Sequence, residues 1–82
     1  MPTIMVILGC RVVVYPNDHR PVHVHVIGGD AEAVFNLHCP HGPPELRENY
    51  GFSRAEVRRF RAALTEALDR MCAAWSEIHG AY

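Results

Sequence analysis

The most regular alternation of hydrophobic and polar positions runs from Val22 to Ile27, where the sequence reads Val-His-Val-His-Val-Ile. A period of two is typical of a strand with one apolar face and one polar face. His23 and His25 are therefore expected on the same face, with Cα atoms roughly 6 to 7 Å apart. The residues that follow, Gly28-Gly29-Asp30, supply a tight turn, and Ala31 to Leu37 is predicted to return as the neighbouring strand.

Two earlier segments predict a hairpin at the start of the chain. Ile4 to Leu8 is an apolar run too short for a helix, and Gly9-Cys10 has turn chemistry. Arg11 to Tyr15 is rich in the branched residues that suit a pleated surface. Together with the alternating strand and its return, these segments predict an antiparallel meander of four strands within residues 1–38.

The second half of the chain predicts a connection and then one helix. Residues 39–52 contain two glycines and three prolines, which favours a connecting loop. Ser53 and Glu56 have the spacing of a capping box, so a helix is expected over residues 53–79, with Gly80 as its stop. Apolar residues recur there every three or four positions, at Val57, Phe60, Leu64, Leu68, Met71, Trp75 and Ile78. The expected fold is α+β: one domain, residues 1–82, in which a four-stranded antiparallel meander packs against one long C-terminal helix.

The length of this helix raises the question of what covers it. A straight helix from Arg54 to His79 would be about 39 Å long, whereas strands of five or six residues span about 17–20 Å. The helix must therefore overhang the sheet, kink, or meet a second copy. An uncovered apolar stripe is an interaction surface, so we expect a homodimer or a partner protein at the distal residues Leu68, Met71, Trp75 and Ile78. The alternative is that the strands and the long loop cover the stripe within one chain.

Composition narrows the classes of function. The net charge of −1 gives no bulk attraction to nucleic acid, and no apolar run approaches the roughly 18 residues that a membrane helix needs. We therefore expect no membrane association. Cys10, Cys39 and Cys72 are odd in number and far apart, which argues against a disulfide framework and favours a cytoplasmic location.

The residues best suited to metal binding or acid–base chemistry lie in or just before the alternating strand. They are Asp18, His19, His23 and His25. Three histidines and a carboxylate are ligand types that suit zinc or another borderline divalent ion, and His19, His23 and His25 are the candidate metal ligands. No other cofactor is indicated. A histidine pair beside an aspartate also suits acid–base chemistry, although no nucleophile motif or phosphate loop accompanies it. A third interpretation is structural, with the imidazoles bonded to loop carbonyls and to Asp18.

A second set of candidates lies on the predicted helix. Arg54, Arg58 and Arg61 share one flank of the apolar stripe, where three guanidinium groups could follow a phosphate backbone, and Arg47 could join them. Acidic residues interrupt the distal surface, however, and a charged helix face is commonly no more than a solvated one. A further candidate for metal capture is the loop sequence His38-Cys39-Pro40-His41.

Motifs along nearly the whole chain resemble the bacterial domain-of-unknown-function family 4160. They are Met1-Pro2-Thr3-Ile4, Tyr15-Pro16-Asn17-Asp18-His19, Pro21-x-His23-x-His25-Val26, Asp30-Ala31-Glu32-Ala33, Leu37, Gly51-Phe52-Ser53 and Trp75. Members of this largely uncharacterised family are commonly encoded beside another small protein and have been proposed to act in toxin–antitoxin-like modules; some are labelled transcriptional regulators.

The resemblance thus implies a non-catalytic binding component of a toxin–antitoxin-like or regulatory module, acting through a partner protein, with nucleic acid as a second class of ligand. Two alternatives stay open. One is a small His-dependent ribonuclease, with or without an assisting metal, and the other is a phage- or plasmid-borne inhibitor that docks on a larger complex.

Overall fold

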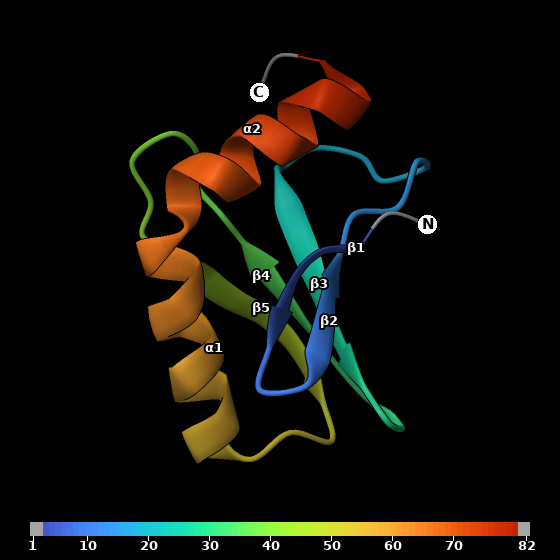
Figure 1. Cartoon of the computed structure of the whole chain (residues 1–82), viewed down its shortest axis with the longest axis vertical. Coiled ribbons are helices and arrows are strands. Elements are labelled where there is room, and N and C mark those ends of the chain that lie inside the picture. The colour runs from blue at the N-terminus through green and yellow to red at the C-terminus, as the bar shows by residue number, and fades with distance from the viewer. Residues whose placement is uncertain (1–2, 81–82) are drawn as a thin grey trace.

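The sheet is an antiparallel meander in which each strand pairs with the next along the chain (Figure 1). The structure is a computed structural model that describes residues 3–80, so two residues at each end of the expected 1–82 domain lie outside the described part. The strands are β1 (Thr3–Ile7), β2 (Cys10–Val13), β3 (His23–Gly28), β4 (Ala31–Asn36) and β5 (Glu45–Tyr50). Positive φ angles at Leu8, Gly9 and Gly29 allow the β1–β2 and β3–β4 hairpins to close through short turns.

The prediction of four strands is wrong, because residues 45–50 form β5 within the segment expected to be a loop. β5 occupies the edge of the sheet beside β4, and most of its side chains are half-buried or exposed. A β-bulge shifts its register, so that Val34 pairs with Glu48 and Phe35 with Leu46, which leaves Arg47 as the extra residue. A polar edge strand with a bulge has no regular apolar alternation from which the sequence could reveal it.

The prediction of one long helix is also wrong. The chain forms α1 (Arg54–Glu66) and α2 (Leu68–His79), and Figure 1 shows the direction changing between them. At the junction, Ala67 has φ −106° and ψ 19°, outside the helical range. The longest dimension of the molecule is 32 Å, less than the length of the straight helix. The break lets both halves lie on the sheet, so of the three outcomes considered the kink is the one that occurs. Neither helix has the length and apolar character needed to cross a membrane.

The distal apolar residues of the helical region belong to the core of the single chain. Met71 and Trp75 are fully buried, Leu68 is 8% exposed, and Ile78 packs against the same cluster. They meet the inward-facing side chains of β3 and β4, among them Val24 and Phe35. The premise of the predicted interface, a stripe that the sheet leaves uncovered, is therefore wrong, because α2 turns across the sheet and the chain itself covers the stripe.

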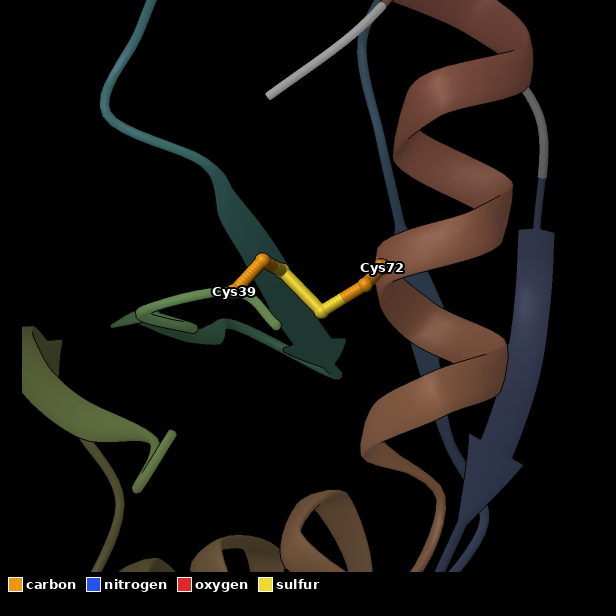
Figure 2. The surroundings of a disulfide bond; sticks show 2 residues. All are labelled: Cys39 and Cys72. Atoms are coloured by element: carbon orange, nitrogen blue, oxygen red, sulfur yellow. A yellow bond between two sulfur atoms is a disulfide. The ribbon is translucent and has the colours of Figure 1, made fainter. Parts of the chain in front are cut away.

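A disulfide joins Cys39, just after β4, to Cys72 in α2 (Figure 2). The two residues are 33 positions apart in sequence, and their Cα atoms lie 5.9 Å apart. Cys10 is the free cysteine. The expectation that the cysteines form no disulfide framework is therefore wrong for Cys39 and Cys72, and the argument from cysteine usage for a cytoplasmic location loses its basis. The bond ties the β4–β5 connection to the helix layer.

Candidate functional site

Strand β3 carries two histidines on the sheet face opposite the helices. Val24 and Val26 point into the helix-covered core, so alternation turns His23 and His25 to the other side. Both side chains are largely buried there, with 6% and 14% of their surface exposed. The rings meet edge to face at a centroid distance of 5.1 Å. The structure thus places the histidine pair together on one face, as a strand of period two requires.

The β2–β3 loop brings Asp18 to this pair. The backbone N–H of Tyr15 donates to Asp18 Oδ2, and the backbone N–H of Asp18 donates back to the Tyr15 carbonyl, both at 3.0 Å. This local turn leaves Oδ1 facing Nε2 of His23 at 3.4 Å and Nε2 of His25 at 3.3 Å. His79 at the end of α2 contacts the same Tyr15 carbonyl at 3.0 Å, which fixes the start of the loop on the helix layer.

The outer nitrogens of both rings have partners as well. Nδ1 of His23 lies 2.7 Å from the Pro21 carbonyl oxygen, which can only accept, so this nitrogen carries the proton. Nδ1 of His25 lies 2.9 Å from Glu32 Oε2 on β4. All four ring nitrogens of His23 and His25 therefore face a protein oxygen. Acid–base catalysis on a bound substrate requires a ring nitrogen directed at the substrate, and in this arrangement none is free for that.

A hollow of about 510 Å³ opens beside the cluster. Its lining combines the loop, β3, β4 and the bulge of β5, with Asn17, Asp18, His19, Arg20, Pro21, His23, His25, Asn36 and Arg47. His19 is exposed and lies outside the compact group formed by Asp18, His23 and His25, so the third potential metal ligand is Asp18. Burial raises the pKa of Tyr15, whose ring packs edge-on against His25, and the negative charge of Glu32 raises that pKa further.

The arginines predicted on the helix line a separate groove of about 360 Å³ between α1 and β5. Its walls are Leu46, Asn49, Phe52, Arg54, Val57, Arg58 and Arg61. The side chain of Asn49 in this wall bonds to both the N–H and the carbonyl of Phe52. Within residues 3–80, the guanidinium groups of Arg54, Arg58 and Arg61 have no ion-pair partner. Arg47 does not join them, because the bulge places it at the histidine hollow.

The His-Cys-Pro-His loop does not form the metal trap considered from the sequence. The Cys39 sulfur is bonded to Cys72, which removes it as a thiolate ligand. His38 lies against Glu45 on β5 at 2.8 Å, with both side chains exposed. These contacts hold the β4–β5 connection in place and offer no converging ligand set.

A family model described as domain of unknown function DUF4160 matches residues 9–76. The chain belongs to the DUF4160 family. The match covers most of this DUF4160 chain and includes Asp18, the histidine pair and the whole arginine groove. Comparison with curated proteins and with solved structures gave no match. The family assignment therefore carries no activity with it.

Sequence reasoning missed Glu32 as a member of the cluster in this DUF4160 protein. The register of the β3–β4 hairpin pairs His25 with Val34, so Glu32 is two residues further on the same face and reaches His25 diagonally. The two-residue turn and the alternation together would have sufficed to find it. The same register pairs Asn36 directly with His23, so Asn36 could have been found in the same way. Arg47 had no such signal, because its position depends on the bulge in an unpredicted strand.

Proposed function

We propose that this DUF4160 protein is a non-catalytic binding component of a bacterial toxin–antitoxin-like or regulatory module, and that it holds a partner protein in the groove between β5 and α1. The observation that carries the proposal is the groove itself, where three guanidinium groups flank an apolar floor and have no ion-pair partner among the described residues. Unpaired arginines at the rim of a groove favour a ligand that brings negative charge.

The occupant that fits best is an extended acidic segment of a protein. β5 is an edge strand with no strand on its outer side among the described residues. Such an edge offers backbone donors and acceptors to an added strand. Leu46, Phe52 and Val57 give apolar contacts below it, and the arginines of α1 pair with carboxylates beside it. Hydrogen bonds to the β5 backbone and contacts with the apolar floor would supply the affinity, and charge pairing with the arginines would supply the selectivity.

Nucleic acid is the second class of ligand for the same groove. The three arginines could follow a phosphate backbone, but the net charge of −1 and the apolar floor favour protein. A ribonuclease that uses the two imidazoles directly as acid and base lacks comparable support, because every ring nitrogen of the histidine pair faces a protein oxygen. A docking inhibitor would use the groove in the same way as a module component and differs in the identity of its partner.

The test is co-purification with the product of the gene that lies beside this one. Light scattering after gel filtration should find a complex with wild-type protein, and titration calorimetry should give its affinity. Reversing two charges with Arg54→Glu and Arg58→Glu should weaken that affinity by at least about tenfold, since two attractions become repulsions. The matched control is Arg59→Glu with Arg70→Glu, two exposed arginines outside the groove, which gives the same change in net charge and should leave the affinity unaltered.

Three outcomes would contradict the proposal. The first is the absence of a complex at micromolar concentration, and the second is equal weakening by the groove variant and the control. The third is binding of a single-stranded oligonucleotide that weakens as salt rises and is lost in the Arg54/Arg58 variant, combined with no effect of that variant on the protein partner. Light scattering of the protein alone also reports whether it forms the homodimer expected from its sequence.

A further inference from the structure

We propose that Asp18, His23 and His25 form a binding site for a divalent cation of the zinc type, with Asp18 Oδ1 and the two Nε2 atoms as ligands. The ligand atoms of the three residues all lie within 4.8 Å of one another. This site lies on the sheet face opposite the helices, whereas the partner groove lies between α1 and β5. The inference is therefore independent of the proposed function.

The first argument is the direction of the lone pairs. The outer nitrogen of His23 donates its proton to the Pro21 carbonyl, so in the neutral ring Nε2 carries a lone pair. The shorter contact of His25, 2.9 Å to Glu32, assigns its proton to Nδ1 in the same way and leaves a lone pair on Nε2. Two lone pairs then converge on a carboxylate oxygen. That arrangement is repulsive unless a positive charge lies among the three atoms.

The second argument is distance. N–H···O hydrogen bonds in proteins are about 2.7–3.2 Å long, which matches the outer contacts of both rings at 2.7 and 2.9 Å. The inner contacts are longer, at 3.4 Å for His23 and 3.3 Å for His25. Ligands placed tetrahedrally about 2.0–2.1 Å from a zinc ion are about 3.3–3.4 Å apart. The inner contacts thus have the spacing of two ligands that share an ion.

Protons on the rings could supply the positive charge, but at a higher electrostatic cost. Both rings face the same oxygen, Asp18 Oδ1, so each would need its own proton on Nε2. That would place two imidazolium ions side by side at a centroid distance of 5.1 Å, with His23 only 5% exposed. Neighbouring like charges in a desolvated place are unfavourable. One divalent ion satisfies both nitrogens and the carboxylate together.

The surroundings have the features of an outer ligand shell. Metal-bound histidines characteristically donate their second N–H to a carboxylate or a backbone carbonyl, which fixes the tautomer. Glu32 does this for His25, and the Pro21 carbonyl does it for His23. Asp18 Oδ2 is held by the Tyr15 N–H, so that Oδ1 alone is directed inward. The adjoining hollow gives the ion a path of entry and a fourth ligand position.

Zinc chloride and cobalt chloride are the probes, added to tag-free protein purified without reductant so that Cys39 and Cys72 stay bonded and offer no thiolates. Calorimetry should give one zinc ion per chain, and the cobalt complex should show the strong visible absorption of four-coordinate Co²⁺. Long-range ¹⁵N spectra of the imidazoles should show His23 and His25 coordinated through Nε2, with Nδ1 protonated. Unchanged imidazole signals at excess zinc would refute the site in the unmodified protein.

Variants separate the site from adventitious binding. Asp18→Asn and His25→Gln should abolish stoichiometric zinc binding. Glu32→Gln should weaken it about 10- to 100-fold. This substitution keeps the test valid even if the others disturb folding, because the Glu32 side chain is 41% exposed and its polar contact is with the His25 ring. His41→Gln, an exposed histidine outside the cluster, and Cys10→Ser should leave the affinity unchanged. Loss of zinc in either control, or full affinity in Glu32→Gln and Asp18→Asn, would overturn the proposal.

Discussion

Breaking the bond between Cys39 and Cys72 should remove a large part of the stability of this protein. The bond closes a loop over 33 positions, and the chain-entropy relation assigns about 3–4 kcal/mol to a loop of that size. Domains are stable by roughly 0.05–0.15 kcal/mol per residue, which gives about 4–12 kcal/mol for 82 residues. Reduction should therefore remove about a quarter or more of the free energy of unfolding.

The assay is urea unfolding of the wild-type protein with and without reductant. Reduction measures the effect of the disulfide alone, because the buried Cys72 keeps its sulfur atom and no cavity forms in the core. With an m-value of roughly 1–3 kcal/mol per molar urea, the midpoint should fall by at least about 1 M. Cys39→Ala with Cys72→Ala should be insensitive to reductant, while Cys10→Ala should keep the full sensitivity. Equal midpoints with and without reductant would refute the reasoning, as would three titratable thiols in the unfolded, unreduced chain.

Three smaller predictions test local contacts. Ser53→Ala removes a capping box and should cost about 1 kcal/mol in urea unfolding, whereas Ser76→Ala within α2 should change stability little. Gly51→Ala should cost roughly 1–3 kcal/mol in the same assay. At this position φ is +101°, and an added Cβ would lie 3.1 Å from the Cβ atom of Ala31. Glu48→Gln should lower the pKa of Tyr50 in an ultraviolet titration, since the hydrogen bond to Glu48 raises that pKa; an unchanged pKa would contradict this cause.

The parts of the fold that local pattern specifies could be predicted from the sequence. Alternation around His23 and His25 predicted the strand and the face on which they lie, and Gly29 predicted the tight turn after it. The capping box at Ser53 predicted where the helical region begins. Each of these features depends on residues within a few positions of one another, where backbone preference and side-chain direction decide the conformation.

The features that depend on tertiary packing could not be predicted in this way. Ala67 has no glycine or proline beside it, and the helix breaks there because its distal half packs on the sheet. Cys39 and Cys72 meet only after α2 has turned back over the β4–β5 connection. In the candidate site, the histidine pair was foreseeable, whereas the choice of Asp18 over His19 depends on the path of a proline-bounded loop.

Strand β5 explains how one small sheet can carry two separate candidate sites. In a regular strand, Leu46 would point inward, Arg47 outward and Glu48 inward, and a carboxylate would then face the core. The bulge adds one residue, so Arg47 and Glu48 both reach the polar side, while Leu46 and Asn49 face the groove beside α1. The groove and the histidine cluster therefore share an element but no lining side chain. Substitutions in one should leave the other intact, so the partner proposal and the metal proposal can each fail alone.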